Sequence, residues 1–578
     1  MASAIRALKI QYSILEFFIF CFIITARISS SVAEPWLPKP VMRVRFPSDA
    51  PISMKKGRLA LLGTILASVF SLSGCFFTIF SGGDEQTTIT PPSIDVAPSL
   101  KLNLLGTNSK TLFPKLENSS MKNPVFEYAS SNTSIATVSQ DGVVTGVSVG
   151  HCNVVVTLQS NKSITRTVNI EVVSKEISHY KYTLMFYMCA SDLEFYSNTT
   201  EDNKQWFFTQ DIQEMLSVKN IPDEVKIIIE TGGTKKWGMP SKYLEGATSI
   251  SSTKLQRWEI NNSTNKLKLI DTLSYNEMAK EYSFADFLSW GLDDYGADQM
   301  GVILSGHGGG IAGCAYDDNY TYKYGTEDYQ YTLQTYEVAN AAKVALQNSS
   351  RDKFTWIGYD CCLMQCADIA TINSDYFEYM VASQELENAT GWNHDVYLPE
   401  LVDNPDISPK DFLPKICDAF LEENHSSTEV EACVQTLSVL DLSKADALVS
   451  SFETIASKLG SGTSAVNKAK QAFRSSFTDF GDAMYGLCDF KSLLNSINSQ
   501  QGIDVTAAKN AVNDLVYYNK YCSKYSVEPC GLNAFFPEYM STDKKYALQV
   551  GREDYDNANA TKFSKWQSIC LASNGFGW

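Results

Sequence analysis

From about residue 180 onward, short apolar runs alternate with segments of helical apolar periodicity. Runs with almost no polar residue are typical of parallel strands, because the helices that connect such strands cover both faces of the sheet. The alternation therefore predicts an α/β fold with a doubly wound sheet and helices on both faces. The expected strands are Tyr182–Met188, Val225–Glu230, Gly301–Leu304 and Phe354–Tyr359. Helices are expected near 206–216, near 284–292 after a cap at Ser283, and over 333–346.

Length and charge narrow the classes of protein further. The chain has 578 residues, of which 44% are hydrophobic, so it is too long for one small domain and too apolar to be disordered throughout. Its net charge is -17, although residues 1–74 are basic, so the remainder is strongly acidic. An acidic surface repels phosphate backbones, which argues against nucleic-acid binding and favours cationic partners. The 14 cysteines form no paired CxxC arrays, so neither a zinc ribbon nor a disulfide scaffold is indicated.

The first 74 residues have the composition of an export leader. Two apolar runs are both shorter than the roughly 20 residues of a spanning helix, and the second follows the basic stretch Lys55–Arg58. This run ends in Leu-Ser-Gly before Cys75, which resembles the lipobox of bacterial lipoproteins. The resemblance implies a lipid anchor on Cys75 and an extracytoplasmic location at the membrane or cell surface. An ordinary signal anchor and a translation start at Met54 both stay open.

Residues 75–95 are rich in Gly, Thr, Pro and acidic residues, which predicts a flexible tether. Between 96 and 174 the pattern changes to short alternating strands, with a tight turn expected at Asp141-Gly142. The run from Ser130 to Gly150 resembles the bacterial Ig-like group 2 domain. The resemblance implies a small all-β sandwich that acts as a spacer and holds the next domain away from the membrane.

Two strand ends of the main domain carry reactive side chains. Strand 301–304 leads into Ser-Gly-His-Gly-Gly-Gly with His307, and strand 354–359 leads into Asp-Cys-Cys-Leu-Met with Cys361 and Cys362. Reactive groups of doubly wound sheets gather beyond the carboxyl ends of the strands. If the two strands are neighbours, an imidazole and a thiol share one crevice, which is the arrangement of a thiolate nucleophile. The alternatives are a loop histidine and a buried apolar cysteine, but the chain has only five histidines.

These motifs resemble the clostripain family of cysteine peptidases, which has a caspase-like fold. Further stretches carry the likeness, which extends over about 180–578: Phe186–Glu194, Ala382–Glu385 with Gly391-Trp392, and Gly531–Pro537. The resemblance implies that His307 is the general base and Cys362, which precedes Leu-Met, the nucleophile. Cys361 is the rival nucleophile. The backbone amides of Gly308 and Cys362 are the expected donors to the oxyanion.

The resemblance also implies a substrate preference. Asp360 matches the acidic residue that favours a basic side chain on the acyl side of the scissile bond, and a carboxylate in a cleft selects Arg or Lys through a charge-assisted pair. A structural role for Asp360 is the alternative, and Glu385 and Asp395 are weaker candidates for the same pocket. His394 stands where relatives often carry an aromatic residue, so it competes for a place in the pocket.

Relatives commonly mature by self-cleavage after a basic residue between the two motifs. Lys323 is the only basic residue between Gly308 and Ala342, so cleavage is expected after Lys323. No cofactor is expected. Calcium supports some relatives, and the pair Asp317-Asp318 is a candidate contributor, although the chain has no EF-hand spacing.

The sequence thus favours a lipid-anchored cysteine endopeptidase that cleaves protein or peptide substrates after Arg or Lys through a thioester acyl-enzyme. Residues 395–578 are expected to complete the sheet and to add helices over Leu442–Leu459 and Ala507–Tyr518. The alternative is a surface adhesin or binding protein that keeps the peptidase fold but has lost the chemistry.

Overall fold

The structure is a computed structural model that describes residues 91–119, 121, 123–195, 206–324, 327–347, 349–424, 435–476, 485–522, 525, 527–538, 552–573 and 575–576. The predicted leader, the lipid site at Cys75 and most of the predicted tether lie outside these residues. No helix in the described part of the chain is both long enough and apolar enough to span a membrane.

A ten-stranded sheet forms the centre of the described residues after Tyr180, with the strand order β12-β14-β13-β11-β10-β15-β18-β19-β20-β22. Its five middle strands run parallel to one another. They are β10 (Tyr180–Cys189), β11 (Val225–Gly232), β15 (Ala297–Ser305), β18 (Phe354–Asp360) and β19 (Phe377–Ala382). The predicted doubly wound α/β sheet is therefore confirmed.

Antiparallel strands extend the sheet on both sides of this parallel centre. They are β12 (Leu244–Glu245), β13 (Gln256–Asn261) and β14 (Lys266–Thr272) on one side, and β20 (Thr436–Asp441) and β22 (Val516–Tyr521) on the other. β12 pairs parallel with β14. The apolar runs predict the parallel centre of the sheet but not these antiparallel strands at its two sides.

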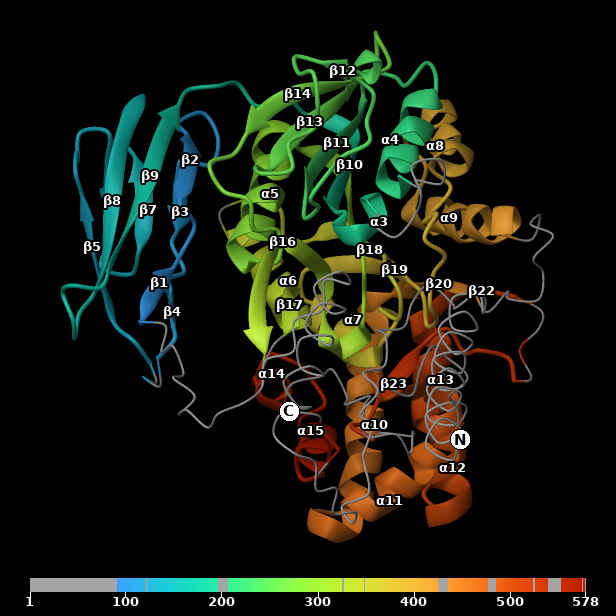
Figure 1. Cartoon of the computed structure of the whole chain (residues 1–578). Helices are drawn as coiled ribbons and strands as arrows, with labels where there is room; N and C mark the ends of the chain where they lie inside the picture. Colours follow the sequence, from blue (N-terminus) through green and yellow to red (C-terminus); the bar gives the residue numbers. More distant parts are fainter. Residues whose placement is uncertain are drawn as a thin grey trace, which may run out of the picture. The chain divides into compact units, whose positions relative to one another are not determined.

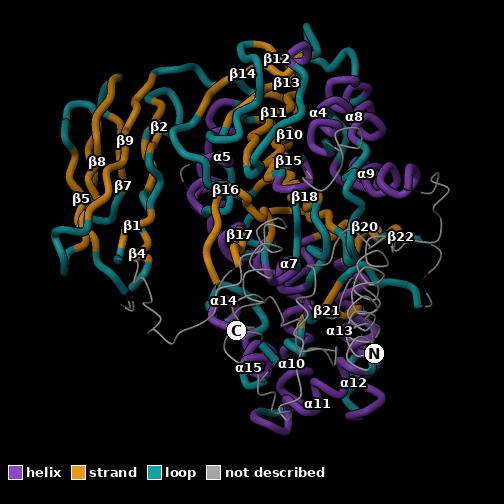
Figure 2. Tube along the Cα trace, viewed as in Figure 1, coloured by secondary structure: helices purple, strands orange, loops and turns teal. Residues whose placement is uncertain are grey.

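Each face of the sheet is buried under helices, as Figures 1 and 2 show. The alternation of β10 explains how: Tyr182, Leu184 and Phe186 belong to one apolar core, whereas Met185 and Tyr187 belong to the other. One core includes residues of α4 (Phe207–Ser217), α8 (His394–Asp403) and α9 (Pro409–Asn424). The other includes residues of α5 (Glu281–Asp294), α6 (Thr335–Gln347) and α7 (Ala367–Asn373).

Two local predictions at helix ends are wrong. Ser283 was expected to cap a helix, but α5 begins at Glu281, with Lys280 at the N-cap position. Ser283 lies inside the first turn, where its hydroxyl donates to the Glu277 carbonyl at 2.6 Å. The helix expected to reach Tyr518 ends at Leu515, because the next residues form β22 at the edge of the sheet.

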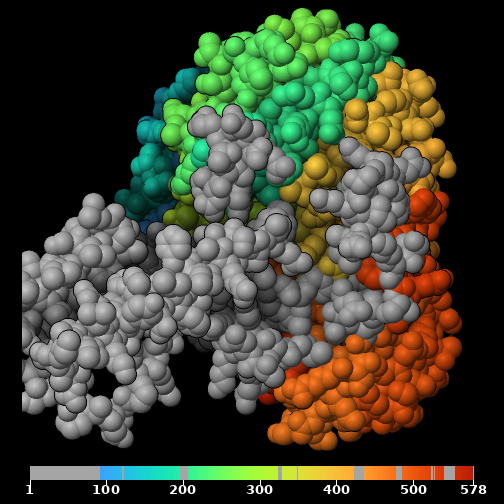
Figure 3. All heavy atoms as spheres, turned by 45° about the vertical axis from the view of Figure 1, so that its right-hand side comes forward, coloured from blue at the N-terminus to red at the C-terminus, as the bar shows by residue number. Residues whose placement is uncertain are grey.

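The remaining C-terminal elements contribute residues to the core that contains α5, α6 and α7. In Figure 3 they lie at the end of the surface that is coloured orange to red. They are α10 (Ala445–Leu459), α11 (Gly462–Arg474), β21 (Leu487–Asp489), α12 (Phe490–Gln501), α13 (Thr506–Leu515), β23 (Asn533–Phe535), α14 (Arg552–Tyr555) and α15 (Ser564–Leu571). A short 3-10 turn, Leu442–Lys444, precedes α10, so the predicted helix over 442–459 begins as a tighter turn.

The Ig-like region forms small all-β sheets, as predicted. One sheet has the order β2-β9-β8-β5 and another has the order β3-β7-β6. The strands are β2 (Ser99–Asn103), β3 (Ser109–Thr111), β5 (Phe126–Ser130), β6 (Ala136–Val138), β7 (Val143–Gly146), β8 (Gly150–Leu158) and β9 (Thr165–Val173). A further pair joins β1 (Ser93–Asp95) to β4 (Lys115–Glu117), so a strand forms within the segment predicted to be a tether.

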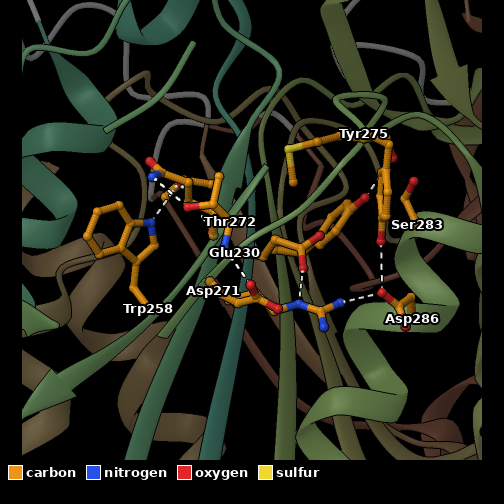
Figure 4. Close-up of polar contacts among 12 residues, drawn as sticks. Glu230, Trp258, Asp271, Thr272, Tyr275, Ser283 and Asp286 are labelled. Carbon is orange, nitrogen blue, oxygen red and sulfur yellow. Dashed lines mark hydrogen bonds and ion pairs between the residues drawn. The ribbon is translucent and has the colours of Figure 1, made fainter. Parts of the chain in front are cut away.

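A buried polar network ties the sheet to α5 (Figure 4). The Arg257 guanidinium donates to Glu230 at 2.7 Å and to Asp286 at 2.8 Å, and the Tyr275 hydroxyl donates to the same Asp286 oxygen at 2.8 Å. The Arg257 side chain is only 7% exposed. A buried guanidinium is tolerated because both carboxylates accept its hydrogen bonds.

Candidate active site

The two strands that lead into the predicted catalytic motifs are neighbours. β15 and β18 pair in parallel, with Ser305 opposite Asp360, and the Gly306 amide donates to the Asp360 carbonyl at 3.2 Å. The residues that follow, His307 and Cys362, therefore leave the same edge of the sheet from adjacent strands. This is the edge at which doubly wound sheets place their binding and catalytic groups.

Gly308 lets the two motif loops approach each other closely. A Cβ atom added at Gly308 would lie 2.4 Å from the Cys362 carbonyl oxygen and 2.8 Å from Cys361 Cβ, closer than van der Waals contact allows. On the other loop, Leu363 has a φ of 67°, a left-handed conformation that branched or bulky residues rarely adopt. The loop that carries the predicted nucleophile is thus strained and tightly packed against the histidine loop, as is common at functional sites.

The predicted general base contacts a carboxylate. His307 Nε2 lies 2.7 Å from Asp192 Oδ1, and Asp192 belongs to α3 (Ser191–Glu194), the short helix after β10. Burial opposes ionisation of Asp192, but the hydrogen bond with His307 and its charge outweigh burial and lower the pKa of Asp192. The His307 ring also packs edge-on against Tyr316. Sequence reasoning assigned no role to Asp192, although it lies in the stretch that follows the first strand.

The two adjacent cysteines point to different surroundings. Cys361 is 1% exposed, lies in the apolar core and donates from its thiol to the Leu304 carbonyl at 3.3 Å. Cys362 is half-buried, and its Sγ accepts a hydrogen bond from the Glu387 amide at 3.3 Å. Burial raises the pKa of the Cys362 thiol to about 12, with nearby carboxylates adding to the effect. Of these two cysteines, only Cys362 is partly exposed to solvent.

Asp360 lies at the end of β18 with 7% of its surface exposed. Burial raises the pKa of Asp360 to about 7, against the lowering effect of the nearby Glu387 side chain, Trp392 amide and Ser305 hydroxyl. Gly391 packs on this carboxylate, because an added Cβ would lie 3.1 and 3.2 Å from its two oxygens. Burial and the neighbouring Asp360 carboxylate raise the pKa of Glu387 well above its ordinary value, so at least one of the two carboxyl groups holds a proton. No motif or spacing in the sequence singles out Glu387.

Two further buried side chains, from helices α4 and α8, lie close to the Asp360 carboxyl group. Ligand atoms of Asp211 in α4, His394 in α8 and Asp360 all lie within 4.8 Å of one another. Burial raises the pKa of Asp211 well above its ordinary value and lowers the pKa of His394 to about 3, so this imidazole is neutral. Among the residues that the structure describes, no Lys or Arg forms an ion pair with Asp211, Asp360 or Glu387.

The weaker pocket candidates occupy different places. Glu385 is 2% exposed, and its carbonyl accepts a hydrogen bond from the Leu363 amide at 3.0 Å, so it supports the cysteine loop. Its charge also contributes to the raised pKa of Cys362. Asp395, in the first turn of α8, is exposed.

The predicted cleavage site lies in a β-hairpin of β16 (Cys314–Tyr324) and β17 (Glu327–Leu333), where Lys323 pairs with Asp328 near the tip. At the other end of this hairpin, Cys314 forms a backbone bridge with Gly308 of the histidine loop. The predicted cleavage site is therefore connected along one hairpin to the predicted oxyanion donor.

The two acidic residues considered for calcium accept hydrogen bonds from the protein. The Asp317 carboxylate accepts from the Met278 amide at 2.7 Å and the Asn319 amide at 2.8 Å. The Asp318 carboxylate accepts from the Ser191 hydroxyl at 3.2 Å and from the Gln330 amide group at 2.5 Å. Both carboxylates thus hold loops together around the hairpin, and calcium at this pair stays a prediction.

Comparison with known proteins identifies the two folded regions. The model of the clostripain family matches residues 195–570, and the model of the bacterial Ig-like domain (group 2) matches residues 92–168. A search of curated proteins finds no match.

Solved structures of similar proteins include a secreted C11 cysteine protease from Bacteroides thetaiotaomicron in complex with an irreversible peptide inhibitor. It is 15% identical, the match covers 68% of this chain and 99% of that chain, and the TM-score is 0.45. An inactive zymogen C11 protease from Parabacteroides distasonis is also 15% identical, with 62% of this chain and 93% of that chain covered and a TM-score of 0.44. Because the family match spans more than half of its length, the chain belongs to the clostripain family, with a bacterial Ig-like domain before the peptidase domain.

Proposed function

We propose that the chain is a cysteine endopeptidase that hydrolyses peptide bonds after Arg or Lys. The observation that carries this proposal is the pairing of β15 with β18, which sets the His307 loop against the Cys362 loop at one sheet edge. Asp360 lies two residues before the thiol, in a pocket without a basic partner among the described residues. A cationic substrate side chain supplies the charge that this pocket lacks.

In the proposed mechanism, His307 removes the thiol proton of Cys362, and the carboxylate of Asp192 holds the imidazole in place and stabilises its charged form. The thiolate attacks the scissile carbonyl, and the amides of Gly308 and Cys362 donate to the resulting oxyanion. The protonated imidazole then gives its proton to the leaving amine, which leaves a thioester. Water, activated by the same imidazole, hydrolyses the thioester and frees the thiol.

We also propose that the single chain is a precursor. In the intact chain the Cys362 thiol is held by the Glu387 amide, and the histidine loop is bridged to the β16–β17 hairpin. Cleavage after Lys323 would cut this hairpin near its tip and release the restraint that the hairpin places on the histidine loop. A Lys323→Ala chain and a Cys362→Ala chain should both stay whole on a denaturing gel, while the unchanged chain gives two bands. Equal processing of all three would refute self-cleavage at this site.

Location is a further part of the proposal. A lipid on Cys75 would anchor the protein outside the membrane, with the Ig-like domain as a spacer between membrane and peptidase. Mass spectrometry of the mature amino terminus tests this directly, because only a lipid-modified Cys75 at the first position agrees with it. Neither family model covers the leader, so this part of the proposal rests on the sequence motif.

The test of activity compares fluorogenic peptides that end in Arg, Lys or Asp, each with and without a thiol alkylator. Arg and Lys peptides should be cleaved, and the alkylator should abolish cleavage. Asp360→Asn should lower kcat/KM for these peptides on the order of 10- to 100-fold, because a charge-assisted pair is lost. Asp395→Asn, at the exposed rival candidate, should leave kcat/KM unchanged. Reactive thiol without turnover of any peptide would favour the adhesin alternative.

A further inference from the structure

The strongest feature without a role in the proposed mechanism is a cluster of three buried carboxyl groups beside the predicted nucleophile, with no described basic partner. Asp211, Asp360 and Glu387 are 4%, 7% and 9% exposed. Among the described residues, neither oxygen of Glu387 has a hydrogen-bond partner by geometry, and its carboxyl interacts electrostatically with that of Asp360. Buried ionised carboxylates cost several kcal/mol each unless a positive charge or protons compensate them. No Lys or Arg pairs with them among the described residues, so within this part of the chain only a bound cation or protons can compensate their charge.

The cluster also contains an imidazole nitrogen, and this nitrogen limits which cations the cluster can bind. His394 is fully buried, and its Nδ1 lies 2.7 Å from the Tyr397 hydroxyl, while Nε2 has no hydrogen-bond partner among the described residues. A neutral imidazole among carboxylates is the donor set that zinc and neighbouring transition metals prefer. Calcium prefers six to eight oxygen ligands and seldom takes a nitrogen ligand.

The distances are compatible with a single ion. The ligand atoms of Asp211, Asp360 and His394 lie within 4.8 Å of one another. Atoms bound to one Zn²⁺ at about 2.0–2.2 Å lie roughly 3 to 4 Å apart, so small side-chain rotations close the set. α4 and α8 are tied together beside it, because the His394 amide donates to Glu214 at 3.1 Å. The helices in Figure 1 that carry Asp211 and His394 lie side by side.

We propose that Asp211, Asp360 and His394 bind one divalent transition-metal ion of the zinc type, with the remaining coordination position open to water. Because Asp360 is shared, the ion and a basic substrate side chain compete for the same carboxylate. Zinc is then a reversible inhibitor that closes the substrate pocket without touching the thiol. The competition rests on the proposed function, whereas metal binding does not.

The binding test uses the full chain with Cys362→Ser, so that the thiol near the site cannot bind the metal. Calorimetric titration with Zn²⁺ should show one site per chain, and Ca²⁺ at the same concentration should show none. Asp211→Asn and His394→Gln should each weaken Zn²⁺ binding by tenfold or more. The matched control is His179→Gln, which removes an exposed histidine that also lies 2.8 Å from a carboxylate, that of Asp298. This control should bind as tightly as its parent.

Binding that survives both Asp211→Asn and His394→Gln, or no binding at all, would overturn the proposal and leave shared protons as the compensating charge. A second measurement needs no variant in the cluster: Co²⁺ bound to the unchanged chain should show ligand-field bands without a thiolate charge-transfer band. A strong thiolate band would also overturn it. Competition is then measured as a rise in KM for Arg peptides with Zn²⁺ at constant kcat. A chain that binds Zn²⁺ as expected but cleaves no peptide would refute the proposed function alone.

Discussion

The Nε2 atom of His307 lies 2.7 Å from a carboxylate oxygen of Asp192, a residue that comes from a different strand end. His307 follows β15, and Asp192 follows β10, its parallel neighbour in the sheet. A carboxylate in this position fixes the orientation of the ring and stabilises the imidazolium that forms when the thiol is deprotonated. The side chain of Asp192 is 48% exposed, so solvent screens part of this effect.

Asp192→Asn should therefore lower kcat on the order of 10- to 100-fold while KM for Arg peptides changes little, since the substrate pocket is untouched. Steady-state kinetics at saturating substrate give this split. Asp298→Asn is a matched control, because Asp298 lies 2.8 Å from the exposed His179 and should leave both constants unchanged. If Asp192→Asn raised KM and spared kcat, Asp192 would act on binding and not as a positioning residue for His307.

Substitution of the two neighbouring cysteines should have opposite consequences. Cys362→Ala should abolish peptide hydrolysis and labelling by an alkylator, because it removes the proposed nucleophile. Cys361→Ala should retain both hydrolysis and labelling. Its free energy of unfolding should fall by about 1 kcal/mol, because the substitution leaves a small cavity in the core and removes the hydrogen bond to the Leu304 carbonyl. Alkylation followed by mass spectrometry and denaturant unfolding measure the two effects. Retained hydrolysis in Cys362→Ala would move the nucleophile elsewhere.

The close approach of the two loops predicts a strong effect of one methyl group. Gly308→Ala places a Cβ against the Cys362 carbonyl and must push the loops apart, so we expect activity to fall at least tenfold in the folded protein. Gly460→Ala is the contrasting variant. Its Cβ would meet nothing within 4 Å, but its φ of 97° favours glycine, so it should cost about 1 kcal/mol of stability and no activity. Circular dichroism and kinetics on both variants separate these outcomes.

The strands and the two motif loops were predictable from the sequence because they depend on local features. Apolar runs identify parallel strands such as β15 and β18, and the glycines after Ser305 mark a sharp turn. The alternation of side chains predicts that Cys361 and Cys362 diverge, and the structure places one in the core and the other at the surface. The sequence alone does not show that β15 and β18 are neighbours, whereas the structure shows that they pair in parallel.

The other members of the site depend on contacts between distant segments. Asp211 lies in an amphipathic helix pattern, where an acidic residue is normally exposed, and it is buried only because α4 and α8 meet over the end of β18. Glu387 follows a strand by several residues, and nothing in its neighbours shows that its amide meets the Cys362 thiol. Such positions follow from loop conformation, which single-sequence patterns do not encode.

The buried network around Arg257 predicts how stability depends on pH. Burial opposes ionisation of Asp286, but Arg257 outweighs it and lowers the pKa of Asp286 below its ordinary value of 3.8. The ionised form is therefore favoured in the folded state, so its stabilisation is complete above about pH 4 and is lost as the pH falls through the folded pKa. Asp286→Asn should lower the free energy of unfolding at pH 7 by about 3 to 5 kcal/mol, because Arg257 stays buried with one partner fewer.

Asp286→Asn should also lose the part of the acid sensitivity that Asp286 contributes, so the difference from the unchanged chain should narrow between pH 4 and pH 2. Denaturant unfolding followed by tryptophan fluorescence at several pH values measures both effects. Glu127→Gln is the control, because the ion pair of Glu127 with Lys162 is half exposed and should contribute less than about 1 kcal/mol. A difference between Asp286→Asn and the unchanged chain that stays constant down to pH 2 would show that packing, and not the charge of Asp286, stabilises this network.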